Sequence, residues 1–452
     1  MTHSERSIFE QVTIESNDQS QDINLIAGVM GLEYFENIFS PNITAKMLIL
    51  NTGDSIEGED GKMQSVYNGL PLRGGERVAI KIKANADTNA GLDFSETYKD
   101  YLHVGAITNV SQNEQIETFT LQLVSRESIS NETIRVPIKF STASRIDVSV
   151  EKILKDYLKT EKALDIDKTK NKYGFIGNMR KPFSILTWLA SKGVPEKGIA
   201  GFVFFQTQDG FHFKSIDNLI NQDPKETYTY SERKESEVES SNDFEIIRYS
   251  TDKNQNLMDK LRLGTYSSFV ATFDPSNSKF NLPQNATITL DDFMKDAKNL
   301  GQEMDIAKQL PKLSDDSSQT LGNTPSRLMS MVLDKGTVER GIFNRLNADP
   351  LEYQAQSIMR YNQLFTQELS MKVPLNTNLR AGDVIECLFP KVTSVDGKGF
   401  DEQQSGSYLI KSLCHRFTKE LSETDMVLVR DTYGMHGQNN DAKKSSQEKL
   451  VK

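Results

Sequence analysis

Cysteine and histidine are scarce in this chain of 452 residues, which contains two cysteines and five histidines. Because these residues are so few, the sequence predicts neither a disulfide framework nor a zinc module. Cys387 and Cys414 both lie in apolar, strand-like sequence, where a free cysteine usually behaves as a small buried hydrophobe. His415 follows Cys414 directly, and adjacent strand residues point to opposite faces, so we expect no metal site there.

Long apolar runs are also missing. No run reaches the roughly 20 residues that a membrane-spanning helix needs. The start, Met1 to Arg6, lacks the basic and then apolar pattern of a signal peptide. We therefore expect a protein that is made and assembled in a cytoplasm. The formal net charge of −10 argues against wrapping a nucleic acid, because such binding needs clustered Lys and Arg. An acidic protein could still line a passage through which DNA slides.

Motifs that carry catalytic chemistry are largely absent. The sequence has no Gly-rich phosphate loop ending in Lys-Ser/Thr, no His-Glu-x-x-His and no Cys pairs at metal spacing. We therefore predict no catalytic, cofactor-binding or metal-binding residues and no cofactor.

One motif favours an enzyme as an alternative. The segment from Leu48 to Ile56 resembles the strand and Gly-Asp-Ser opening of GDSL-type esterases, with Ser55 as the nucleophile. Two pairs match the Asp-x-x-His element of this class, Asp209 with His212 and Asp100 with His103. Against this reading, that class needs helices between its strands, and residues 8–145 predict almost none. Asp209-Gly210 is also better explained as a hairpin turn, with His212 as a half-exposed strand residue.

Strands dominate the predicted secondary structure of the first 145 residues. Residues 77–83 alternate apolar and polar side chains strictly, residues 119–124 do the same, and residues 43–50 mix alternation with an apolar run. Strand-like sequence returns at Phe244. The sequence thus predicts a mainly β protein.

A small α+β module is predicted after residue 145. Residues 150–158 carry one apolar helical stripe, with Asp147 as a plausible N-cap. A second helix is expected to begin at Pro182, and a hairpin over 201–214 follows, turning at Asp209-Gly210. We expect the five phenylalanines of this hairpin to be core rather than a partner-binding patch: Phe202, Phe204, Phe205, Phe211 and Phe213.

Two distant regions of the sequence repeat one pattern. Leu72-Arg73-Gly74-Gly75-Glu76 opens the first copy, which closes at Val124 to Glu127. Leu379-Arg380-Ala381-Gly382-Asp383 opens the second copy, which closes at Val429 to Asp431. In each copy the Leu-Arg-x-Gly-acidic segment enters a strand, a hairpin follows, and an apolar strand ends in Arg-acidic. We interpret this as an internal duplication of one β-barrel domain.

Several segments, in this order, resemble baseplate hub proteins of T-even-like contractile phages, which are similar to the hubs of type VI secretion spikes. The segments are Gly31 to Ala45, Arg180 to Ala190, Phe202 to Leu219, Met258 to Tyr266, Phe273 to Pro275, Leu379 to Glu386, Ser405 to Ile410 and Arg430 to Gly434.

The resemblance implies a non-enzymatic virion protein of the tail baseplate. It implies a homotrimer whose six tube-like barrels form a pseudo-six-fold ring. That ring adapts the tail tube to a three-fold central spike and forms part of the genome-ejection channel. The implied partners are the spike protein, the tail tube protein or tube initiator, wedge proteins of the baseplate and the tape-measure protein. DNA passes without sequence-specific binding, and no membrane insertion is implied.

Six segments divide the chain on this interpretation. They are a first tube-like barrel (1–145), the α+β module (146–230), a linker with the start of the second barrel (231–275), an insertion of mixed helix and loop (276–365), the rest of the second barrel (366–435) and a disordered tail (436–452). A β-barrel adhesin is a further alternative, which lacks the central channel of a hub.

Overall fold

The computed structural model describes most of the chain. The described residues are 7–52, 56–57, 61–70, 72–84, 89–231, 244–253, 256–275, 277–281, 286–294, 297, 299–301, 310–334, 347, 351–391 and 399–434. Ser55 and the tail predicted to be disordered from residue 436 lie outside this part.

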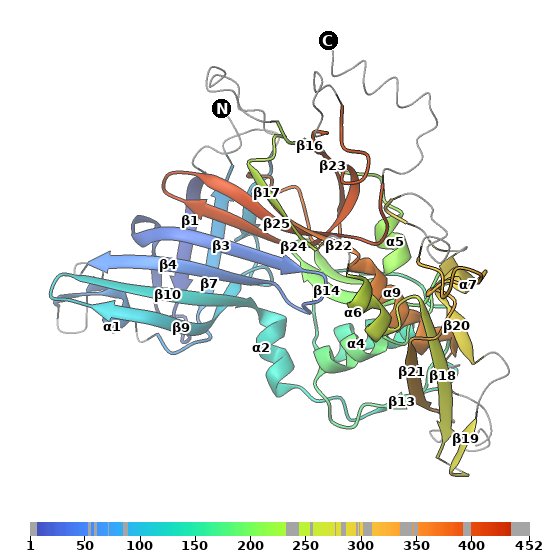
Figure 1. Cartoon of the computed structure of the whole chain (residues 1–452). Helices are drawn as coiled ribbons and strands as arrows, with labels where there is room; N and C mark the ends of the chain where they lie inside the picture. The colour runs from blue at the N-terminus through green and yellow to red at the C-terminus, as the bar shows by residue number, and fades with distance from the viewer. Residues whose placement is uncertain are drawn as a thin grey trace.

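One large sheet of 14 strands forms the body of the molecule (Figure 1). Its neighbouring strands are, in order, β17 (Arg248–Lys253), β22 (Gln367–Pro374), β25 (Ser422–Arg430), β24 (Gly406–Thr418), β3 (Val29–Asn37), β4 (Thr44–Thr52), β10 (Ile116–Ser125), β9 (Leu102–Gln112), β7 (Arg77–Lys83), β1 (Ile8–Glu15) and β2 (Asp22–Asn24). Off this path, β8 (Leu92–Phe94) pairs with β7, while β23 (Val384–Leu388) pairs with β24 and with β16 (Thr227–Thr229).

The sheet serves two separate cores. The strands before residue 126 enclose one cluster of buried side chains, which includes Val12, Met47 and Leu121. The strands after residue 226 enclose another, which includes Met371 and Leu428. The predicted mainly β fold is confirmed. Both cysteines are buried, as expected.

Short elements complete the N-terminal part. They are a 3-10 turn, η1 (Ile26–Gly28), the small hairpin β5 (Ile56–Glu57) with β6 (Met63–Gln64), and two helices, α1 (Val66–Gly69) and α2 (Arg126–Thr133). The two helices are short, of 4 and 8 residues, so the regular structure described in this segment is mainly β, as expected. Alternation does not reveal α2, because this helix is polar, with Glu127 and Asn131 as its buried residues.

The predicted α+β module lies below the large sheet, drawn green in Figure 1. Its elements are β11 (Lys139–Phe140), α3 (Ile146–Lys152), the π-helical turn η2 (Ile153–Tyr157), β12 (Ala163–Ile166), β13 (Phe175–Ile176), α4 (Pro182–Ala190), β14 (Phe202–Thr207), β15 (Gly210–Ser215) and α5 (Ile216–Ile220). The hairpin and the start of α4 at Pro182 are confirmed. All five hairpin phenylalanines are buried, as expected.

The expected N-cap of α3 is wrong. Arg145 precedes the helix, and Asp147 lies inside its first turn. The Asp147 carboxylate instead accepts hydrogen bonds from Thr169 Oγ1 at 2.8 Å and from the Arg145 guanidinium at 2.7 Å. A contact 22 residues away along the chain therefore competes with local capping.

A second small sheet lies between β17 and β22 in sequence and projects at the lower right of Figure 1. It contains β18 (Ser267–Asp274), β19 (Lys279–Asn281), β20 (Thr287–Thr289) and β21 (Arg327–Val332). Helices α6 (Leu257–Leu263), α7 (Leu290–Met294), η3 (Leu351–Ala355) and α9 (Gln356–Leu364) accompany it. The expected helix over 291–309 is described only as α7. No helix in the described part of the chain is long and apolar enough to span a bilayer.

The two sequence repeats adopt the same local structure. Gly75 and Gly382 both have φ of 94°, a left-handed conformation that favours glycine. Gly75 N–H donates to Val104 O at 2.7 Å, and Gly382 N–H donates to Ile410 O at 2.8 Å. In return, Val104 N–H donates to Glu76 O at 2.9 Å, and Ile410 N–H donates to Asp383 O at 2.8 Å.

The strands that follow these turns also correspond. β9 and β10 form a hairpin, as β24 and β25 do, and each hairpin has a one-residue shift in register just after the residue bonded to the glycine. The first hairpin has a further shift, between Thr118 and Thr120. β4 pairs with the edge of β10 that faces away from β9. In the same way, β22 pairs with the edge of β25 that faces away from β24. This matching of loops, pairings and bulges supports the internal duplication.

Candidate functional site: a three-way junction

A fully buried carboxylate, Glu36 on β3, joins three parts of the chain. Its Oε1 accepts hydrogen bonds from Tyr34 Oη and from Gln208 N–H, both at 2.8 Å. Its Oε2 accepts one from Ala381 N–H at 2.9 Å. The first β unit, the β14–β15 turn and the loop of the second repeat therefore meet at one side chain. Burial raises the pKa of the Glu36 carboxyl, while Arg380 and the backbone donors act in the opposite direction.

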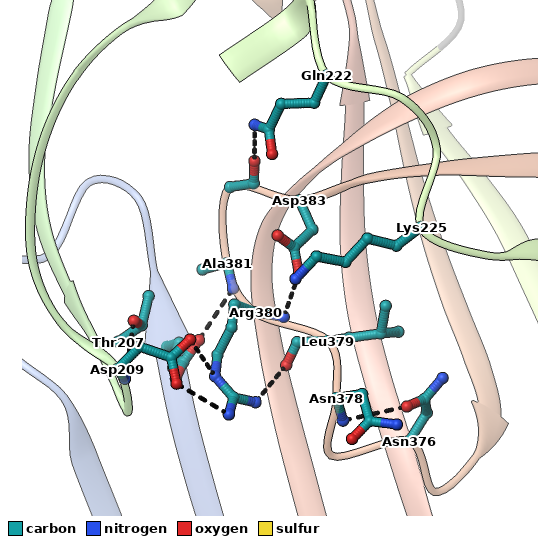
Figure 2. A network of polar contacts seen from close by, with 12 residues as sticks. Thr207, Asp209, Gln222, Lys225, Asn376, Asn378, Leu379, Arg380, Ala381 and Asp383 are labelled. Atoms are coloured by element: carbon teal, nitrogen blue, oxygen red, sulfur yellow. Dashed lines mark hydrogen bonds and ion pairs between the residues drawn. The ribbon is translucent and has the colours of Figure 1, made fainter. Parts of the chain in front are cut away.

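Arg380 extends this junction on the side of the second repeat. Its Nε and Nη2 donate to the two carboxylate oxygens of Asp209, at 3.1 and 3.2 Å, and Figure 2 shows this forked contact. Its Nη1 donates to Leu379 O at 3.0 Å. The planar guanidinium of Arg380 thus holds the β14–β15 turn of the module against the loop that contains Arg380.

The acidic residue of the repeat closes the other side of the loop. Asp383 Oδ2 accepts from Arg380 N–H at 2.7 Å and from Lys225 Nζ at 2.8 Å. Gln222 Nε2 donates to Gly382 O at 3.0 Å, so the segment after α5 is held to the same loop (Figure 2). In the first repeat, Glu76 bonds Arg73 N–H at 2.6 Å in the same way.

A second buried cluster lies where α9, α5 and the end of β25 meet. The Arg360 guanidinium, with no exposed side-chain area, binds Asp217 Oδ1 at 2.8 Å and Asp431 Oδ2 at 2.9 Å. Asp217 also accepts from Ile199 N–H at 2.7 Å, and Asp431 from Leu300 N–H at 2.9 Å. Burial raises the pKa of Asp217, and Arg360 opposes that rise.

Lys260 on α6 is buried beside this cluster. Its amine donates to Thr366 Oγ1. Burial lowers the pKa of Lys260 to about 7, against the raising effect of Asp431.

The low pKa of Lys260 predicts a pH dependence of stability. Below pH 7 both the folded and the unfolded state carry the charge. Between pH 7 and the ordinary value of 10.5 only the unfolded state does, so stability should rise with pH across this window. The difference in unfolding free energy between wild type and Lys260→Met, measured from pH 6 to 10, should follow this rise. A difference that stays constant with pH would contradict it.

The residues of the esterase alternative serve other contacts. Asp209 binds Arg380, whereas His212 Nε2 lies 2.8 Å from Thr207 Oγ1 and its ring stacks on Phe205. Asp100 accepts from Thr97 Oγ1 at 2.6 Å. His103 Nδ1 lies 3.2 Å from Gly75 O. These contacts position turns and strands.

Sequence reasoning missed Glu36, Arg360 and Asp217. A signal for Glu36 was present, because it continues the buried alternation of Leu32 and Tyr34 on β3, and a charge at an inward strand position needs buried partners. The positions of Arg360 and Asp217 on short helices give no comparable signal.

Comparisons with known proteins rest on structure. No protein-family model matches the sequence, and no curated protein matches it either. The tail protein from Neisseria meningitidis MC58 superposes with a TM-score of 0.53 at 9 % identity, covering 93 % of this chain and 96 % of that one.

Two further structures align less well. The 43 kDa tail protein of prophage MuSo2 from Shewanella oneidensis gives a TM-score of 0.48 at 8 % identity, covering 93 % and 98 % of the two chains. The E. coli c3393 protein, a component of the type VI secretion system, gives 0.42 at 10 % identity, covering 94 % and 78 %. On the Neisseria superposition, this chain has the fold of a tail protein, and the resemblance indicated by its sequence motifs is confirmed at the level of the fold.

Proposed function

We propose that this chain is the structural hub of a contractile-tail baseplate, in which three copies form a ring between the tail tube and a central spike. The observation that carries the proposal is the sheet itself. Eight consecutive strands, from β17 to β9, run without interruption through both repeats, because β24 of the second pairs with β3 of the first. In the proposed ring, this sheet would form one segment of the wall around the central channel.

One face of this wall is polar, and several of its charges are paired. Arg416 binds Glu33 at 3.0 Å and Asp425 at 3.4 Å. Lys372 binds Glu423 at 2.5 Å and Asp425 at 3.7 Å. The opposite face packs on the cores, through residues such as Met47 and Leu428.

The polar face is also hollowed. A cleft of about 610 Å³ lies over it, with Phe35, Lys372 and Arg416 among its lining residues. A hollowed surface on which Lys372 and Arg416 are held by carboxylates suits a channel, since pairing leaves these two cations less free to bind a passing polyanion.

The proposed location and partners of the chain are based on its similarity to the fold of a tail protein. The chain would act by assembly and carry no catalytic residues. It would lie in the virion tail, contact the spike, tube, wedge and tape-measure proteins, and let DNA pass through the ring.

Native mass spectrometry tests the proposal. Purified protein, alone and with its spike partner, should give a species with three chains of 51.0 kDa each. A chain that stays monomeric under both conditions would overturn the hub assignment.

A further inference from the structure

Two segments of the α+β module contain many cations and no carboxylate. Residues 133–146 and 168–195 together have nine Lys and Arg residues and neither Asp nor Glu. Since the whole chain has a formal net charge of −10 and these segments contribute +9, the rest of the chain carries −19. This separation of charge within one chain indicates a surface that attracts anionic groups.

The fold brings the two segments together. β11 on the first segment pairs antiparallel with β13 on the second, and Lys139 faces Ile176 in this pair. Just outside the strands, Val136 N–H donates to Arg180 O at 3.1 Å. These elements lie below the large sheet, at the lower end of the molecule (Figure 1). Cations that are far apart in the sequence therefore share one small surface.

Two of these cations are available to a partner. Lys139 and Arg180 are both exposed, and in the described part of the chain neither has a carboxylate within ion-pair distance. The Arg180 guanidinium lies over the Trp188 ring, 5.8 Å from its centroid, so its position is held by the module. Two other cations are already paired with carboxylates just beyond the ends of the segments, Arg145 with Asp147 and Lys181 with Glu132.

Apolar side chains are exposed beside the two available cations. Ile176 is 48 % exposed, and Met179, in the turn after β13, is 60 % exposed. We call Lys139, Ile176, Met179 and Arg180 the turn patch. Exposed apolar side chains that are flanked by cations are typical of a surface that binds a partner with both apolar and anionic groups.

The turn that carries Met179 has an unusual backbone. Asn178 and Met179 have positive φ angles of 49° and 56°, and Arg180 N–H donates to Gly177 O at 3.0 Å. Turns of this kind favour asparagine followed by glycine, because other side chains adopt a left-handed conformation only at a cost. Local folding would thus prefer glycine at position 179. An exposed methionine kept in a strained conformation indicates a binding contact.

We propose that the turn patch docks an acidic, amphipathic segment of a partner protein. The apolar side chains of that segment cover Ile176 and Met179, and its carboxylates pair with Lys139 and Arg180. Charge complementarity gives the sign of the partner, and the exposed apolar side chains favour a polypeptide over a nucleic acid, which binds mainly through its phosphates. An anionic membrane suits the patch less well, because it would repel the −19 of the rest of the chain. Such docking does not require that the chain forms a ring.

A displayed library of random linear peptides tests the proposal on the full-length protein. Selection on the wild type should enrich peptides that combine Asp or Glu with large apolar residues. The affinity of a synthetic copy of the best peptide, measured by fluorescence anisotropy, should fall at least about tenfold in K139E/R180E, because like charges then face each other. The matched control K279E/K419E makes the same change of net charge at two exposed lysines outside the two segments. It should bind the peptide as the wild type does.

Met179→Gly separates docking from folding. Glycine relieves the left-handed conformation, so the midpoint of thermal unfolding should stay the same or rise. Loss of the apolar side chain should weaken binding of the same peptide by about tenfold. A variant that unfolds earlier than the wild type would show that Met179 serves the fold, and would overturn its role in docking.

Two other results would overturn the proposal as a whole. One is a selection that enriches no acidic peptide, or acidic peptides that bind K139E/R180E as tightly as they bind the wild type. The other comes from vesicles of phosphatidylglycerol. If the wild type binds them, if K139E/R180E does not, and if neither binds phosphatidylcholine, the turn patch is a membrane contact and its occupant is not a protein segment.

Discussion

Replacing Arg360 with methionine is expected to lower the free energy of unfolding by about 3–5 kcal/mol, because it leaves two buried carboxylates without their cation. Asp217 and Asp431 both depend on this guanidinium, at 2.8 and 2.9 Å, and none of the three is accessible to water to any useful extent. The cluster links α9 and α5 to the end of β25. Chemical denaturation of wild type and variant measures the loss.

Arg262→Met is the matched control for this prediction. Arg262 pairs with Asp259 at 3.6 Å, but its side chain is 74 % exposed. An exposed pair contributes only about 0–1 kcal/mol, so the control should unfold almost as the wild type does. Equal denaturation curves for the two variants would show that the buried cluster does not hold these elements together.

Replacing Glu36 with leucine should have a comparable effect through unpaired donors. Tyr34 Oη and the N–H groups of Gln208 and Ala381 would lose their acceptor. Each buried donor left without a partner costs about 1–3 kcal/mol. Glu36→Gln keeps a side-chain oxygen and should cost less. The denaturation midpoints should therefore fall in the order wild type, Gln, Leu.

Glu33 provides the control on the same strand. It lies on the polar face of β3 and pairs with Arg416, with 35 % of its side chain exposed. Glu33→Leu removes a carboxylate from the same β-strand without leaving buried donors. If it destabilises the protein as much as Glu36→Leu does, the junction has no special role in joining the three parts.

Local sequence patterns were sufficient to predict much of the fold. Strict alternation located β7 and β10, and Asp209-Gly210 located the hairpin of the module. The Leu-Arg-x-Gly-acidic repeat identified two corresponding turns, because a left-handed glycine and an acidic side chain that bonds the loop are local requirements.

Long-range contacts account for what the sequence did not predict. The joining of β24 to β3 pairs residues nearly a whole chain apart, and alternation within a strand does not reveal its neighbour. Arg360 likewise acts through carboxylates on two other elements. The boundaries of the six predicted segments, and the exclusion of catalysis, stay predictions.

Negative-stain electron microscopy of the purified protein, with and without its spike partner, is the direct test of the hub assignment. We expect rings with three-fold symmetry, six lobes and an open centre, in which each pair of lobes is one chain with its two repeats. Compact particles without a central opening, in the presence of the spike as well as in its absence, would contradict it.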